Sequence, residues 1–277
     1  MILPTASGAG WDSDRLDLDA YLARIGHAGR PGPSAGTLRA LHHAHVLAIP
    51  FDNLEIWLGR PIPLDLPSLQ DKLVKRGRGG YCYEHTLLFA AVLDRLGFRV
   101  TGLGARVRVG SDQIRPTTHA LLSVDVDGQR WLADVGFGGT GLLEPILLRD
   151  AVQVVQHGWT YRLTEEVGGV FALRALRPEG WLDLHAFTLE RRYRADFAVM
   201  NHYISTHPRS PFVGRLVVGR TDGARRLSLN DTRLTVARPD TTEHTTELRS
   251  EDLPTVLRDV FGYHLEPDEA ARLSAAA

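Results

Sequence analysis

The spacing of apolar residues changes at Phe98, and this change constrains the fold more than any other feature of the chain. Before Phe98 the apolar residues recur at helical spacing, and after it they alternate with period two. We expect helices over residues 16–25, 37–48, 68–75 and 82–96. We expect strands over 98–109, 118–126, 129–137, 159–164, 170–176 and 182–189. Six strands separated by Gly, Pro and Asp turns indicate an antiparallel sheet that closes toward a small barrel.

The last third of the sequence mixes both patterns. A helix is expected over 195–205 and another over 253–261, and short strands are expected over 216–220, 226–229, 232–237 and 245–249. The remainder, from Glu266, reads as a polar and then Ala-rich tail. The chain is therefore predicted to be an α+β protein with three parts, at residues 1–97, 98–193 and 194–277.

Composition excludes several classes of function. The formal net charge is -1, so the chain has no basic excess with which to bind nucleic acid. No apolar run approaches the length of a membrane span, and residues 1–20 lack the apolar core of a signal peptide. We therefore expect a cytoplasmic protein without membrane or nucleic-acid partners.

A single cysteine, Cys82, excludes an internal disulfide and a cysteine-rich zinc site. Three histidines, His42, His43 and His45, fall on one predicted helix. Metal ligation from one helix face needs partners three or four residues apart and a third ligand. We interpret these histidines as packed or exposed helix residues and expect no metal site.

Cys82 lies where a glycine-rich loop enters an apolar helix. Gly77, Gly79 and Gly80 precede it, and a long apolar run follows it. A cysteine in the first turn of a helix meets unpaired N–H groups and the positive end of the helix dipole, which favour a thiolate. A lone buried cysteine is more often inert packing, so its partners decide between the two interpretations.

His119 and Asp134 are predicted to be neighbours on one sheet face. Asp127-Gly128 is a two-residue hairpin signal, and it places Val126 opposite Gln129. The same register places residue 121 opposite residue 134, so the His119 and Asp134 side chains are diagonal neighbours. A bulge in this hairpin would separate them. Without a bulge, the Asp134 carboxylate orients the His119 imidazole. A cysteine nucleophile requires a base that is oriented in this way.

A second glycine-rich segment follows the aspartate directly, at residues 135–139. Its glycines are compatible with an ordinary strand end or with the close approach of a ligand or a backbone segment. Neither this segment nor residues 76–80 matches a phosphate-binding motif.

These segments together resemble the arylamine N-acetyltransferases. The likeness is carried by residues 49–56, residues 78–85, Thr118-His119, residues 134–139 and residues 201–212, in the order of that family. Thr86 and Tyr83 depart from the asparagine and phenylalanine expected there. The resemblance implies an N-terminal helical bundle, a central antiparallel β-barrel and a C-terminal α/β lid, with a Cys-His-Asp core like that of cysteine proteases.

The resemblance also implies an activity and a set of site residues. It implies acetyl-coenzyme A as donor, an arylamine or arylhydrazine as acceptor, and ping-pong order. Cys82 is then the nucleophile, His119 the base and Asp134 its orienting group. Thr118, Phe137, Gly138, Gly139 and Phe212 are expected to contact the coenzyme, and Phe51, Phe137 and Phe212 the acceptor.

Three alternatives remain open at this point. An amide synthase that closes a macrolactam from a carrier-bound polyketide would use the same triad. A papain-like or transglutaminase-like hydrolase shares the order Cys, His, Asp along the chain. A binding module that retains an inactive triad is the third alternative, and the sequence leaves the oligomeric state undetermined.

Overall fold

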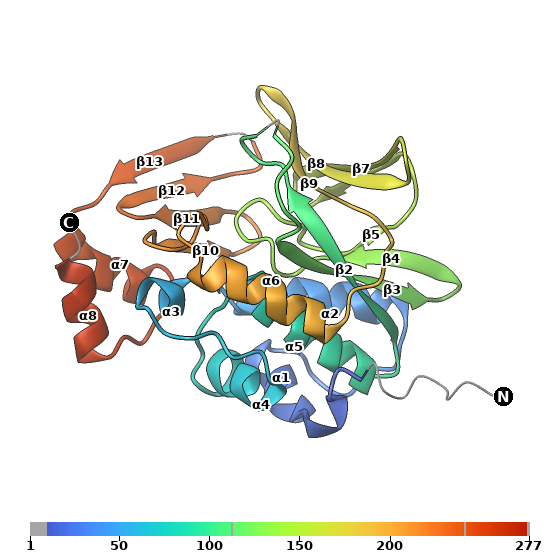
Figure 1. The fold of residues 1–277 in the computed structure, drawn as a ribbon, viewed down its shortest axis with the longest axis horizontal. Coiled ribbons are helices and arrows are strands. Elements are labelled where there is room, and N and C mark those ends of the chain that lie inside the picture. Colours follow the sequence, from blue (N-terminus) through green and yellow to red (C-terminus); the bar gives the residue numbers. More distant parts are fainter. Residues whose placement is uncertain (1–9, 112, 241, 276–277) are drawn as a thin grey trace.

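The computed structural model describes residues 10–111, 113–240 and 242–275, and its helices and strands form an α+β fold (Figure 1). The helices are α1 (Leu18–Arg24), α2 (Ala35–Ala48), α3 (Leu54–Trp57), α4 (Leu66–Leu69), α5 (Cys82–Arg95), α6 (Arg194–Thr206), α7 (Leu253–Asp259) and α8 (Pro267–Ser274). Shorter helical turns are η1 (Ser13–Arg15), the π-helical η2 (Gln70–Lys75) and η3 (Ser250–Asp252). Two sheets lie side by side in Figure 1, with α1, α2, α4 and α5 beneath them.

The helical first third confirms the sequence pattern, with one correction at a helix start. Ser34 caps α2 by accepting the Thr37 N–H at 3.1 Å. The expected helix at 68–75 begins earlier, because Asp65 and not Ser68 is the N-cap, and Asp65 accepts the Ser68 N–H at 3.0 Å. Pro67 follows in the first turn, where its missing N–H costs nothing. Every residue of α5 from Cys82 to Leu93 is buried, which confirms a central helix.

An eight-stranded antiparallel sheet forms the nearly closed barrel, in the order β5-β4-β3-β2-β9-β8-β7-β6. Its strands are β2 (Arg99–Val107), β3 (His119–Val126), β4 (Gln129–Ala133), β5 (Ile146–Leu147), β6 (Val152–Gln156), β7 (Trp159–Glu166), β8 (Val170–Arg177) and β9 (Gly180–Phe187). The six expected strands are present, whereas β5 and β6 were not expected. The strand expected over 129–137 ends at Ala133, because the Asp134 N–H bonds to the side chain of His42.

The second sheet has the order β1-β10-β11-β12-β13. Its strands are β1 (Phe51–Asp52), β10 (Val217–Thr221), β11 (Arg226–Asn230), β12 (Arg233–Ala237) and β13 (Glu243–Glu247). The two-residue strand β1 was not expected, and it joins the first third of the chain to the last. The polar tail from Glu266, for which no helix was predicted, contains α8, which packs with α7 beside this sheet (Figure 1).

Buried side chains gather in three clusters that position the candidate site. Alternate residues of β3 face opposite sides: Ala120 and Leu122 pack toward α5, whereas Leu121 faces the interior of the barrel. The third cluster lies between the five-stranded sheet and helices α3, α7 and α8. Within the described residues, no helix is both long enough and apolar enough to cross a membrane. The three-part division at 97/98 and 193/194 stays a prediction.

Candidate active site

The loop before Cys82 is held against the segment that contains β1. The Asp52 N–H donates to the Gly80 carbonyl at 2.7 Å, and the Gly80 N–H donates to the Pro50 carbonyl at 3.2 Å. A Cβ atom at Gly79 would lie 2.3 Å from the Pro50 oxygen and 2.3 Å from Asp52 Oδ2. Any side chain there would separate the two segments, so this approach requires glycine.

The first turn of α5 is anchored by a buried ion pair. Glu84 Oε2 accepts the Tyr81 N–H at 3.1 Å, and Glu84 Oε1 lies 2.7 Å from Lys72 Nζ. Both charged side chains are at least nine-tenths buried. The pair fixes the helix start at the residue after Tyr81, which is Cys82.

The hairpin brings His119 and Asp134 together as the sequence predicts. Val126 pairs with Gln129 and Leu122 with Ala133, without a bulge between β3 and β4. His119 Nε2 lies 2.9 Å from Asp134 Oδ2, and both side chains are almost fully buried. His119 and Cys82 line the same cavity.

The pair is strongly polarised. Burial by itself would lower the pKa of His119, but the Asp134 carboxylate and the nearby Cys82 outweigh burial and raise this pKa to about 10. Burial acts to raise the pKa of Asp134, and His119 and His185 reverse that effect and hold the pKa well below its usual range. The site therefore favours an imidazolium beside a carboxylate.

His185 is a member of this cluster that sequence reasoning missed. Its Nε2 lies 3.0 Å from Asp134 Oδ2, the oxygen that also contacts His119. Burial lowers the pKa of His185, so the ring is neutral and its Nε2–H donates to the carboxylate. His185 stands on β9, and only the pairing of β2 with both β3 and β9 brings it to Asp134.

His42 supports Asp134 from the opposite direction. The Asp134 N–H donates to His42 Nε2 at 3.2 Å, and His42 Nδ1 lies 3.2 Å from the Leu143 carbonyl. Burial lowers the pKa of His42 to about 4. The interpretation of His42 as a packed helix residue is thus confirmed. Its side chain supports the backbone at Asp134.

A cavity of about 1300 Å³ opens in front of Cys82. Five of the six predicted cleft residues line it, namely Phe51, Thr118, Phe137, Gly139 and Phe212, and His119, the expected base, lines it as well. Gly138 lines a smaller neighbouring cavity together with Phe51, Phe137 and Gly139. The Phe51 and Phe212 rings are 6.0 Å apart, so they form an aromatic wall.

The charge of the cavity lining could not be recognised from the sequence. Six arginines line it, at positions 115, 177, 209, 215, 226 and 233, against one carboxylate, Glu243. They come from the loop before β3, from β8, from the segment after α6 and from two strands of the small sheet. Such a lining favours an anionic ligand.

Comparison with known proteins gives one consistent result. A family model described as N-acetyltransferase matches residues 34–270. The arylamine N-acetyltransferase of Mycolicibacterium smegmatis is 45% identical over 236 residues, which are 83% of this chain and 85% of that protein. The crystal structure of the Nocardia farcinica arylamine N-acetyltransferase has 44% identity and a TM-score of 0.94, with 98% of each chain covered. A Mycobacterium marinum arylamine N-acetyltransferase, solved in complex with CoA, has 33% identity and a TM-score of 0.87, with 94% and 100% covered.

Proposed function

The chain belongs to the arylamine N-acetyltransferase family, and on this premise we propose that it moves an acetyl group from acetyl-coenzyme A to an arylamine or arylhydrazine nitrogen. The order is ping-pong, through an acetyl thioester on Cys82. The observation that carries the proposal is the buried His119–Asp134 pair, whose side chains are in contact at 2.9 Å. His119 lines the same cavity as Cys82, which is the only cysteine of the sequence.

In the first half-reaction Cys82 acts as the nucleophile. His119 holds the thiol proton as an imidazolium, stabilised by Asp134. The thiolate forms a bond to the thioester carbonyl carbon, and backbone N–H groups at the start of α5 stabilise the oxyanion. The bond from that carbon to the coenzyme sulfur then breaks, and the leaving sulfur takes the proton from His119.

In the second half-reaction the amine nitrogen attacks the acetyl-cysteine. His119 accepts the amine proton, the bond to Cys82 Sγ breaks, and the thiolate is regenerated. The aromatic side chains Phe51, Phe137 and Phe212 are assigned to the acceptor ring. Phe137 also packs edge-on against His119, with ring centroids 5.1 Å apart. This apolar wall limits access of water to the thioester.

The arginines of the cavity support a coenzyme A ligand, which carries phosphate groups. Arginine binds phosphate through charge-assisted, often bidentate hydrogen bonds. The Mycobacterium marinum relative is a CoA complex, which agrees with this assignment. We assign Thr118, Phe137, Gly138, Gly139 and Phe212 to the coenzyme side of the cleft.

Mass spectrometry of the intact protein tests the proposal. Saturating acetyl-CoA is expected to add one acetyl group to the wild-type protein and none to Cys82→Ala. Addition of an arylamine or hydrazine is expected to remove that group and release the acetylated amine. Circular dichroism of Cys82→Ala checks that the fold is retained.

Two outcomes would overturn the assignment. If saturating acetyl-CoA leaves Cys82 unmodified, the assignment as a transferase is wrong, and the assignment as an amide synthase with the same triad gains support. If water removes the acetyl group rapidly and amines do not accelerate the loss, the chain is a hydrolase.

A further inference from the structure

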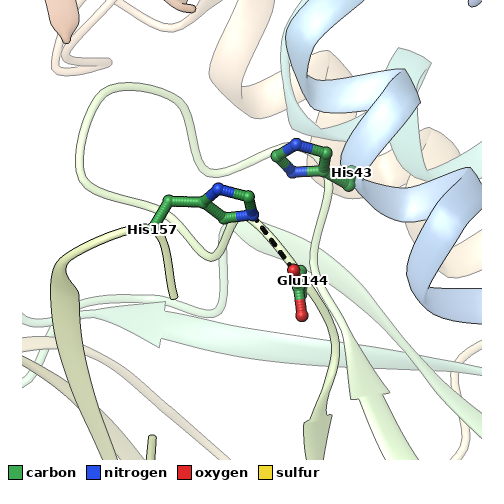
Figure 2. Close-up of side chains that lie close together, drawn as sticks. All are labelled: His43, Glu144 and His157. Carbon is green, nitrogen blue, oxygen red and sulfur yellow. Dashed lines mark hydrogen bonds and ion pairs between the residues drawn. The ribbon is translucent and has the colours of Figure 1, made fainter. Parts of the chain in front are cut away.

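His43, Glu144 and His157 converge at a second place in the fold (Figure 2). His43 comes from α2, Glu144 from the loop between β4 and β5, and His157 from the turn between β6 and β7. Each offers one ligand atom, and these atoms all lie within 4.8 Å of one another. None of these three residues is among the described residues that line the Cys82 cavity.

The loop that carries Glu144 is fixed by a buried glutamine. Gln156 Oε1 accepts the N–H groups of Leu143 at 2.9 Å and of Glu144 at 3.1 Å. Its Nε2 donates to the Glu144 carbonyl at 2.8 Å. Because Gln156 directly precedes His157, the same contacts hold the backbones of two of the three residues together.

The two histidine rings are stacked face to face. Their centroids are 4.2 Å apart and their planes differ by 5°. His43 Nδ1 lies 3.4 Å from the Leu143 carbonyl, so it carries the proton and leaves the Nε2 lone pair free. Metal-ligating histidines usually show this arrangement, in which the second ring nitrogen donates to a backbone carbonyl. His157 Nε2 lies 3.1 Å from Glu144 Oε1 (Figure 2).

We propose that His43, Glu144 and His157 bind a divalent zinc ion. Two imidazoles and one carboxylate are a common zinc ligand set, and water would occupy the remaining position. When His157 Nε2 binds the ion, its hydrogen bond with Glu144 is broken, and any proton on that nitrogen passes to Nδ1 or to solvent. The three side chains are only half-buried or exposed, so they can rotate inward to reach bonding distance.

The consequence of binding is structural. The ion joins α2 to the β4–β5 loop and to the β6–β7 turn. His42, the neighbour of His43, accepts the Asp134 N–H at 3.2 Å. A zinc ion at this position therefore stiffens the backbone behind Asp134 without contacting the cavity.

Zinc titration of the full chain tests the proposal in a Cys82→Ser background, which removes the thiol as a competing ligand. Calorimetry is expected to give one bound zinc per chain, and the Tm is expected to rise by about 3 °C or more under saturating zinc. His157→Asn is expected to abolish both signals and to fold normally, because the positive φ of 51° at this turn suits asparagine. His43→Gln is expected to abolish them as well.

His264→Asn is the matched control, because His264 is an exposed histidine far from this cluster in the sequence. It is expected to keep the full zinc response. The proposal is wrong if no saturable binding occurs, or if zinc binding persists unchanged in His157→Asn. Persistence would place the ion at the buried group His119, Asp134 and His185 instead. If His43→Gln does not fold, His157→Asn decides the question.

Discussion

Gly136 lies directly against the backbone of Cys82: a Cβ atom at Gly136 would stand 2.8 Å from Cys82 Cα and 3.0 Å from its carbonyl oxygen. Cys82 belongs to a buried helix that cannot move without disturbing the core. Gly136→Ala is therefore expected to lower the free energy of unfolding by about 1–3 kcal/mol. It is also expected to slow acetylation of Cys82 by about 10²-fold, because small displacements of reacting groups are costly.

Gly139→Ala is the matched control for stability, since no atom lies within 4 Å of a Cβ placed there. Urea unfolding of the two variants and the rate of acetyl-enzyme formation by mass spectrometry provide the measurements. Equal stability of the two variants would contradict the close approach of Gly136 to Cys82.

The hydrogen bond from His185 to Asp134 predicts a positioning role. This bond contributes to the low pKa of Asp134, so His185→Phe is expected to raise that pKa and move the acid limb of kcat/KM to higher pH. We expect kcat/KM to fall about tenfold, as for the loss of a hydrogen bond of about 1.4 kcal/mol to a charged group. His185→Asn keeps an N–H donor and is expected to restore part of the activity. A loss of stability with an unchanged pH profile would mean that His185 only fills space.

Protonation of His119 predicts how stability depends on pH. The folded state raises the pKa of His119 from 6.5 to about 10, so it retains a proton that the unfolded chain loses. This contribution is complete below about pH 6.5 and is lost as the pH rises toward 10. Between pH 7 and pH 9 the free energy of unfolding is expected to fall by about 2–3 kcal/mol from this group. Urea titrations of wild type and His119→Gln provide the comparison, and parallel slopes in the two proteins would refute the prediction.

The only two lysines of the chain, Lys72 and Lys75, offer a contrast in burial. Lys72 is buried beside Glu84 with a 2.7 Å contact, whereas Lys75 is exposed. Lys72→Met leaves the Glu84 carboxylate buried without its partner and is expected to lower the free energy of unfolding by about 3–5 kcal/mol. Lys75→Met is expected to change it by less than about 0.5 kcal/mol. Chemical denaturation measures both, and a similar loss in both variants would rule out a special role for the buried pair.

Local patterns were sufficient to predict much of the fold and the centre of the candidate site. The change of period at Phe98 separates the helical third from the barrel, and the Asp127-Gly128 turn places His119 near Asp134 because side-chain parity along a strand is strict. The start of α5 at Cys82 follows from the glycines and the apolar run. The cytoplasmic location stays a prediction.

What could not be predicted depends on pairings between distant segments. His185 reaches Asp134 only through the register of β2 with β9, and periodicity within one strand carries no information about that register. The two-residue strand β1 has too few residues to show a period. The arginines of the cavity lie on elements that meet only in the folded chain. The same holds for Glu144 and His157, which the sequence places far from His43.

Helix α8 has a consequence for how the protein is made. Glu269, almost fully buried, accepts hydrogen bonds from Arg60 and from Arg78, the residue that opens the loop before Cys82. Arg78 and Glu269 are separated by 191 positions along the chain. During translation the guanidinium of Arg78 emerges from the ribosome long before its carboxylate partner does. The loop ahead of Cys82 thus reaches its final electrostatic surroundings only after α8 has been synthesised.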